Sequence, residues 1–113
     1  MVNAAKAKGS RAERLVADYL IANGIACERI PAGATEDRGD LWVPLSHFPT
    51  IDVKNHKSMA LAEWVDRAVE QAAFAGRCAG VVWHKRARKT APGDWYVTTN
   101  GAGFLRLLGE ASK

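Results

Sequence analysis

The chain has 113 residues, 48% of them hydrophobic and 25% charged, which is the composition of one globular domain spanning residues 1–113. No apolar run approaches the 18 or so residues of a membrane span, and the polar N-terminus lacks the apolar segment of a secretory signal. We therefore expect no membrane partner and a cytoplasmic protein, in the host cytoplasm if a phage encodes it. The net charge of +4 is compatible with a nucleic-acid partner, although many basic proteins bind nothing acidic.

Two cysteines, Cys27 and Cys78, lie far apart in the sequence and have no CxxC-type partner. This spacing argues against a zinc site. Each cysteine lies in an apolar stretch, which predicts a reduced, buried thiol.

The N-terminal part of the chain predicts a helix followed by a strand. Residues 1–8 are expected to be flexible, and the helix is expected from Ser10 onward because apolar residues recur at helical spacing, at Ala12, Leu15, Val16, Tyr19 and Leu20. An Asn-Gly pair should end this helix, with Gly24 in the left-handed conformation that favours glycine. Loose alternation then predicts a strand over residues 25–30, and a turn-rich composition predicts a loop over residues 31–39.

Two short strands are predicted next, LWV (41–43) and TIDVKN (50–55), with PLSHFP between them. Pro44 and Pro49 fit poorly inside a strand ladder, so they should bracket a hairpin loop. If Val43 pairs near Pro49, the register of the whole hairpin follows.

That register places Leu41 opposite Ile51 and Asp40 opposite Asp52. The two carboxylate-bearing Cβ atoms would then be about 5 Å apart. A slip of one residue would undo this alignment. Lys54 would stand on the same side of the strand as Asp52, two residues further along.

The second half of the chain predicts one long helix, two strands and a short helix. The helix covers residues 58–75 and ends at Gly76, and the apolar run at 79–83 predicts a central strand. A basic loop (85–94), a strand (95–99) and a last helix capped by Asn100 complete the chain. The predicted fold is α/β with the element order α-β-β-β-α-β-β-α.

Asp40, Asp52 and Lys54 together have the chemistry that phosphodiester hydrolysis needs. Two adjacent carboxylates repel each other unless a cation or a proton lies between them, and their hard oxygen atoms suit magnesium or manganese. A nearby lysine could hold the attacking water or neutralise the phosphate. The alternatives are that Asp40 is a turn residue and that Asp52 and Lys54 face solvent, since a D-x-K triplet occurs by chance in many proteins.

Glu13 is a further candidate, at the edge of the apolar stripe of the first helix. Its neighbours three and four residues away are Gly9, Ser10, Val16 and Ala17, so it has no ion-pair partner on its own helix. It should point toward the element on which the helix packs. The alternative is a glutamate at the rim of the core with its carboxylate in water.

In combination these residues resemble the PD-(D/E)xK nuclease superfamily, and within it the archaeal-type Holliday junction resolvases. The likeness runs from about Lys8 to Trp83 and includes G-S-R-A-E (9–13), the I-D-V-K strand (51–54) and EQAAFAG (70–76). The resemblance implies a restriction-endonuclease-like mixed sheet flanked by helices. It assigns a role in holding the metal to Glu13, Asp40 and Asp52, water activation to Lys54, and an active-site position to Gln71, which could equally be an outward polar residue.

The resemblance also implies a Mg²⁺ cofactor, for which Mn²⁺ should substitute, and a homodimer that cuts branched DNA such as a four-way junction. Candidate contacts to DNA phosphates are the basic residues near the N-terminus and in the loop, namely Lys8, Arg11, Lys85, Arg86, Arg88 and Lys89. For these charges the alternative is a solvated face or loop.

The chain departs from the resolvase pattern at two positions. Those proteins tend to carry a serine after the second element, where this chain reads PAGAT, so that only Thr35 could supply a hydroxyl. Asp52 stands where glutamate is common, which shortens the reach to a metal by one methylene.

Two other interpretations compete with a junction resolvase. The same fold could act on flaps, ends or plain duplex. Alternatively, the chain could be a non-catalytic DNA-binding module that uses the basic loop with an exposed Trp95 or Tyr96. The histidines at 47, 56 and 84 are too scattered along the sequence to predict a zinc site or an HNH-type site.

Overall fold

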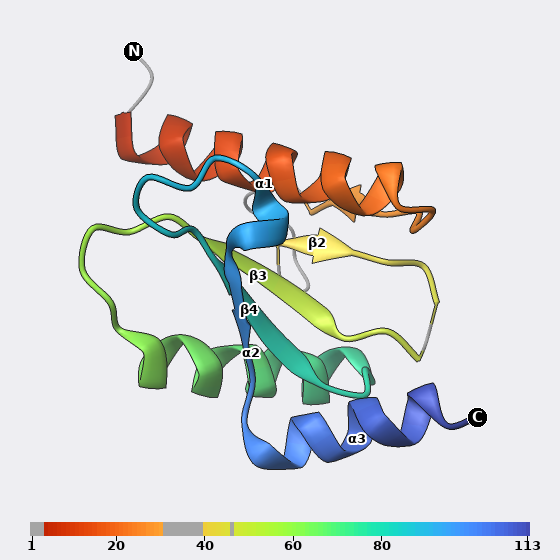
Figure 1. Ribbon diagram of the computed structural model, residues 1–113. Helices are drawn as coiled ribbons and strands as arrows, with labels where there is room; N and C mark the ends of the chain where they lie inside the picture. Colours follow the sequence, from red (N-terminus) through yellow and green to blue (C-terminus); the bar gives the residue numbers. More distant parts are fainter. Residues whose placement is uncertain (1–3, 31–39, 46) are drawn as a thin grey trace.

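A mixed five-stranded sheet forms the centre of the molecule, between helices α1 and α2 (Figure 1). The computed structural model describes residues 4–30, 40–45 and 47–113, with side chains from Ala7 onward. Along the chain the elements are α1 (Ala4–Ala22), β1 (Glu28–Arg29), β2 (Leu41–Trp42), β3 (Thr50–Lys54), α2 (Leu61–Ala75), β4 (Gly80–His84), the short 3-10 helix η1 (Pro92–Asp94), β5 (Tyr96–Thr98) and α3 (Gly101–Ala111). The expected α/β class and the order of helices and strands are confirmed, with η1 as an addition.

Helix α1 begins earlier than the sequence pattern predicts. Its first residue is Ala4 rather than Ser10, so residues 4–8 form its first part, and the flexibility expected of residues 1–8 stays a prediction. That segment is rich in alanine and lysine, which both have high helix propensity and need no apolar stripe to continue a helix. The expected glycine ends are confirmed, since Gly24 has a φ of 84° and Gly76 has a φ of 68°.

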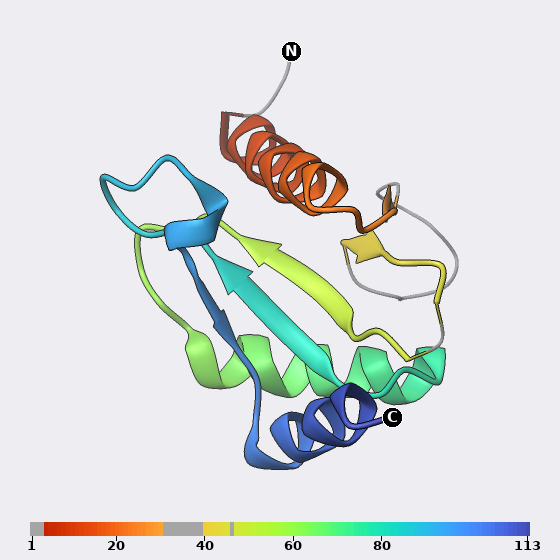
Figure 2. The same ribbon diagram turned by 45° about the vertical axis from the view of Figure 1, so that its right-hand side comes forward.

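Strands β3 and β4 run parallel, and every other strand pair is antiparallel. The sheet order is β1-β2-β3-β4-β5, so β4 is an interior strand, as predicted. Helix α2 makes the crossover between the two parallel strands. Their arrowheads therefore point to the same edge of the sheet, where the loop that follows β4 also lies (Figure 2).

The two faces of β3 are covered by different helices. Ile51 and Val53 belong to the main core cluster, which also contains Val16 of α1 and Leu41 of β2. The Thr50 hydroxyl donates a hydrogen bond of 3.4 Å to the carbonyl oxygen of Ala68 in α2. Because side chains alternate along a strand, Asp52 and Lys54 share the α2 face with Thr50.

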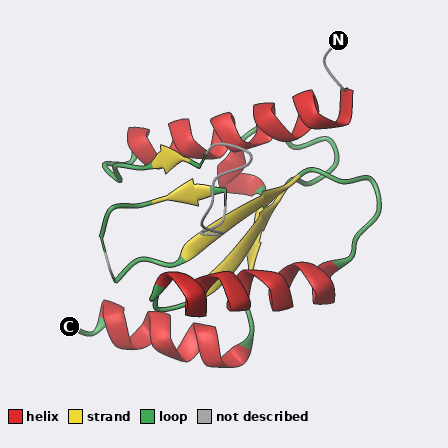
Figure 3. Cartoon of the chain, turned by 180° about the vertical axis from the view of Figure 1, so that it is seen from behind, coloured by secondary structure: helices red, strands yellow, loops and turns green. Residues whose placement is uncertain are grey.

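Close contact between α2 and the sheet depends on Gly80 at the start of β4. A Cβ atom at this position would lie 2.0 Å from the carbonyl oxygen of Ala68. The absence of a side chain lets α2 approach the sheet, and Val65, Ala68 and Val82 form a second, smaller apolar cluster there. The view from behind shows α2 packed along this face, with α3 beside it (Figure 3).

Helix α3 closes the C-terminal end of the chain. The side chain of Asn100 accepts a hydrogen bond of 2.8 Å from the backbone N–H of Gly103, which confirms the predicted cap. Phe104 and Leu105 on this helix are largely exposed. In the described part of the chain no helix combines the length and the apolar character needed to cross a membrane.

Candidate functional site

The hairpin of β2 and β3 has the register that the prolines predict, with Leu41 paired to Ile51. One residue before this pair, the backbone N–H of Asp40 donates to the carbonyl oxygen of Ile51 at 3.0 Å. The Asp40 carboxylate accepts a hydrogen bond from the backbone N–H of Val53, with 2.7 Å between nitrogen and Oδ2. The Asp40 side chain therefore lies against the peptide unit that joins Asp52 to Val53.

Asp52 is only 4% exposed, so the alternative of a solvent-facing strand residue is wrong for this side chain. Its carboxylate lies on the α2 face, and Lys54 ends the strand on the same face, half-buried. A buried carboxylate is stable only when hydrogen bonds or opposite charges surround it. Asp52 is a buried carboxylate two residues before Lys54 on the same strand face, and it directly precedes the Val53 N–H that binds Asp40.

Gln71 also belongs to this face of the sheet. It is 6% exposed and lies one helical turn after Ala68, whose carbonyl oxygen binds Thr50. Residues three positions apart on a helix point to the same side, so Gln71 faces the sheet. The alternative of an outward polar residue is therefore wrong.

Glu13 lies elsewhere, on α1 over the opposite face of the sheet. Its Oε2 is 3.1 Å from Nη2 of Arg29 in β1, so it has an ion-pair partner across elements, and it points toward the sheet edge as expected. Within residues 4–30, 40–45 and 47–113, no three His, Cys, Asp or Glu side chains gather closely enough to hold a metal ion. The Asp40 carboxylate is held at the backbone N–H of Val53, directly after Asp52 in the chain, and the metal roles of Asp40, Asp52 and Glu13 stay predictions. The predicted loop with Thr35 lies outside the described residues.

Polar side chains form a row across the α2 face where β3 and β4 end. Lys54 pairs with His84 in the parallel ladder, and His84 pairs with Tyr96 in the antiparallel ladder to β5. Paired residues stand on the same side of a sheet, and neighbouring strands are about 4.8 Å apart. Lys54, His84 and Tyr96 therefore follow one another directly.

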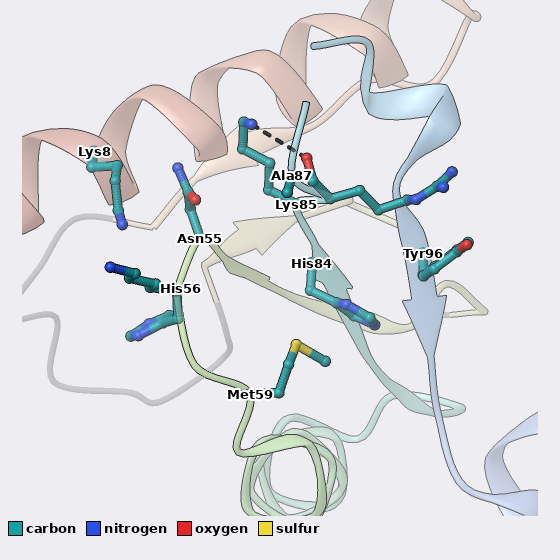
Figure 4. Close-up of a pocket in the computed structure, with 10 residues that line it drawn as sticks. Lys8, Asn55, His56, Met59, His84, Lys85, Ala87 and Tyr96 are labelled. Atoms are coloured by element: carbon teal, nitrogen blue, oxygen red, sulfur yellow. Dashed lines mark hydrogen bonds between the residues drawn. The ribbon is translucent and has the colours of Figure 1, made fainter. Parts of the chain in front are cut away.

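His84 and Tyr96 of this row line a cavity of about 570 Å³ just outside the strand ends (Figure 4). Lys8 of α1 points into it from one side, and Lys57, Lys85 and Arg86 come from the loops after β3 and β4. None of the residues that line it is Asp or Glu. Open α/β sheets commonly bind ligands outside the carboxyl ends of their strands, and this cavity has that position and a positive charge.

One wall of the cavity is formed by the rings of His56, His84 and Tyr96, and Trp64, which does not line the cavity, links the first two. The ring centroid of Trp64 is 5.3 Å from that of His56 and 6.4 Å from that of His84, and the His84 ring is 6.1 Å from the Tyr96 ring. The Arg86 guanidinium lies 4.5 Å from the centroid of Tyr96 and continues the chain. The wall therefore joins flat rings to a flat cation.

His84 is the buried member of this wall. It is 6% exposed, and its Nε2 is 2.8 Å from the hydroxyl oxygen of Thr98. Desolvation by burial lowers the pKa of His84 below the ordinary value of 6.5. Its ring is therefore neutral at pH 7 and adds no charge to the cavity.

The basic loop after β4 is held in place by two tryptophans. The indole N–H of Trp83 donates to the carbonyl oxygen of Pro92 at 3.1 Å, and that of Trp95 donates to the carbonyl oxygen of Lys89 at 2.8 Å. Trp95 is 5% exposed and packs in the main core cluster, so the expectation of an exposed Trp95 is wrong. Tyr96 is 55% exposed, as expected. The turn at η1 directs the Trp95 side chain into the core and leaves the Tyr96 side chain at the surface.

The predicted DNA-binding residues divide into two groups. Lys8, Lys85 and Arg86 line the cavity. Arg11, Arg88 and Lys89 are exposed but do not line it. Sequence reasoning missed His56 and Lys57, which directly follow β3, although their position just after the D-x-K strand was a usable signal.

No protein-family model, curated protein or solved structure matches the chain. The fold and the site define a mixed α/β protein in which the Asp40 carboxylate is hydrogen-bonded to the strand that carries Asp52 and Lys54, with a cationic cavity at the ends of its parallel strands.

Proposed function

We propose that the protein is a metal-dependent endodeoxyribonuclease of the restriction-endonuclease-like PD-(D/E)xK class, acting on branched DNA such as a Holliday junction. The observation that carries the proposal is the hydrogen bond that holds the Asp40 carboxylate at the Asp52–Val53 peptide unit. It ties Asp40, one residue before β2, to the backbone of β3 next to Asp52, and Lys54 stands on the same face as Asp52. The cationic cavity next to Lys54 gives a polyanion a place to bind.

Asp40 and Asp52 fit a divalent ion as a pair. Magnesium typically binds through one or two protein carboxylates and completes its coordination with water and substrate phosphate, so a third protein ligand is not required. The Val53 N–H fixes one oxygen of Asp40, which orients the carboxylate as outer hydrogen bonds orient metal ligands in general. Glu13 would join directly or through water only by leaving Arg29. The cofactor we propose is Mg²⁺, with Mn²⁺ as a substitute.

A bound divalent ion supplies Lewis-acid chemistry, since it polarises a phosphoryl oxygen and makes water more acidic. The residues of the chain do the rest. Lys54 would hold the attacking water or offset the charge that develops on the phosphate. Water attacks phosphorus in line with the departing ester oxygen, so one P–O bond forms as another breaks, and cations of the cavity hold the adjoining strand.

The test is to offer the purified protein a four-way junction, a flap and a linear duplex, each with magnesium and with chelator. We expect magnesium-dependent cutting, greatest on the junction. Asp52→Asn should abolish cutting while binding to branched DNA survives. Asp66→Asn, an exposed aspartate on the outside of α2, is the matched control and should cut normally. Full cutting by a folded Asp52→Asn variant overturns the assignment, and equal cutting of flap or duplex moves the substrate to the same-fold alternatives.

A DNA-binding module without catalysis is the second candidate. It is favoured by the cationic cavity lined by Lys8, Lys57 and Lys85, which can bind a polyanion without a metal. Binding to DNA with no cutting of any substrate, in magnesium or manganese, would decide for this module. The proposed homodimer suits paired cuts across a junction, and analytical ultracentrifugation measures it directly.

A further inference from the structure

We infer that the cationic cavity binds one unpaired nucleotide of a DNA strand, with the phosphate on its lysines and the base against the Arg86–Tyr96 pair. The inference deepens the proposed function and rests on it for the choice of DNA as the polymer. It specifies the part of the DNA that the cavity binds, namely a nucleotide that is not paired in a duplex.

The size and the charge of the cavity favour a single nucleotide over a duplex. Cavities of a few hundred Å³ enclose one small ligand, and this one is about 570 Å³. A duplex needs only an exposed basic surface, because its phosphates lie on the outside. Here Lys57 and Lys85 line a hollow instead.

The ring wall is the second observation, and it points to a base. Proteins that bind single strands combine a positive groove with flat side chains on which bases stack. His56, His84 and Tyr96 line this cavity, and Trp64 outside it links His56 to His84, with ring centroids 5.3 to 6.4 Å apart along the series. Tyr96 is more than half exposed, so a base can reach it. Within a duplex the faces of the bases are covered by their neighbours.

The platform at the end of the wall is already in place. Nη1 of Arg86 donates to the carbonyl oxygen of Asp94 at 3.0 Å, which holds the guanidinium over Tyr96. Arginine planes stack on bases as aromatic rings do. Burial lowers the pKa of His84, so this part of the wall stays neutral and supports stacking at pH 7. Little ordering remains to be done on binding.

The experiment measures binding in chelator, so that no strand is cut. The probes are a fluorescein-labelled oligothymidylate, an abasic strand of the same length, and a matched duplex. Tyr96→Ala should lower the affinity for the oligothymidylate by about 5- to 150-fold, since stacking is worth about 1–3 kcal/mol per base. It should leave the affinity for the abasic strand unchanged. Arg86→Lys keeps the positive charge but removes the planar guanidinium, so it should also lower the affinity for the oligothymidylate.

Variants of the lysines test the phosphate contact separately. Lys57→Ala should weaken binding to both single strands and lower the salt slope by about 0.7 for each lost contact. Arg106→Ala on α3 removes an exposed charge remote from the cavity and is the matched control. It should change neither quantity.

The inference is overturned if Tyr96→Ala weakens binding of the abasic strand and of the oligothymidylate equally. It is also overturned if binding of the duplex depends on Tyr96 to the same extent. Base-dependent binding without any magnesium-dependent cutting would remove the nuclease proposal and leave the nucleotide site. Cutting that persists without base-dependent binding would remove the nucleotide site and leave the nuclease.

Discussion

The two faces of the central sheet are built for different tasks. Toward α1 the sheet is apolar and closed, and Val16 and Leu41 there have no exposed surface at all. Toward α2 the apolar cluster is small, and it gives way to a polar row and a cavity where the strands end. Strand β3 contributes to both, since Ile51 faces the core while Asp52 faces α2.

This difference teaches how a short chain can carry a site without a separate domain for it. Because side chains alternate along a strand, the odd positions of β3 face the apolar core and the even positions, Thr50, Asp52 and Lys54, are polar and face α2. Substitutions on the α1 face should therefore change stability, whereas those on the α2 face near the strand ends should change ligand binding or activity. Gly80 is the exception, because it sets how closely α2 approaches.

The largest effect is expected from Gly80→Ala. The added Cβ would meet the carbonyl oxygen of Ala68 at 2.0 Å, and backbone atoms cannot move aside as a flexible side chain can. We expect a loss of about 3 kcal/mol or more in the free energy of unfolding, measured by urea denaturation. Gly109→Ala in α3 is the control, because nothing lies within 4 Å of its Cβ. It should gain about 0.5–1 kcal/mol, and equal stability of the two variants would contradict the close packing of α2.

The α1 face is tested by Leu41→Ala. Leu41 is fully buried in the main core cluster, and truncating such a leucine costs about 2–5 kcal/mol through lost burial and the cavity left behind. Leu105→Ala on α3 is the matched control, since that side chain is 69% exposed, and it should change the free energy of unfolding by less than about 0.5 kcal/mol. A small effect of Leu41→Ala would mean that the apolar face is less tightly packed than described.

The sequence predicts those features that depend on neighbours in the chain. Pro44 and Pro49 limit the hairpin loop, and this was enough to obtain the pairing of Leu41 with Ile51. The glycine at 76 and the asparagine at 100 mark helix ends because their side chains, or the lack of one, decide the local backbone.

The cavity could not be predicted in the same way. His56 and His84 are scattered along the sequence, and they meet only because Lys54 pairs with His84 across the α2 crossover. A parallel register has no turn of its own to specify it. Trp95 was misjudged for a related reason, since the strand was predicted to start there and η1 instead turns its side chain into the core.

The α2 face should also show a pH effect on stability below neutral pH, through His84. Burial holds the pKa of His84 below 6.5, so the unfolded chain takes up a proton first as the pH falls. The stabilising contribution is therefore fully present above about pH 6.5 and decreases as the pH falls below that value. Urea denaturation at about pH 7.5 and about pH 5.5 should show a larger loss for the wild type than for His84→Gln. His47→Gln, an exposed control, should behave like the wild type.

The smallest effect is expected at the ion pair of Glu13 and Arg29, which separates a structural role from a metal role on the α1 side. The two side chains are partly exposed, and such pairs contribute about 0.2–1 kcal/mol, so a double-mutant cycle with Glu13→Gln and Arg29→Gln should give a coupling in that range. If Glu13 serves only the ion pair, both single variants should lower DNA cutting equally little. If Glu13 reaches the metal, Glu13→Gln should remove most of the cutting activity. Arg29→Gln should retain the activity, because it only frees the Glu13 carboxylate. A large loss of DNA cutting with Arg29→Gln but not with Glu13→Gln would contradict both roles. It would assign the functional charge to Arg29 in β1.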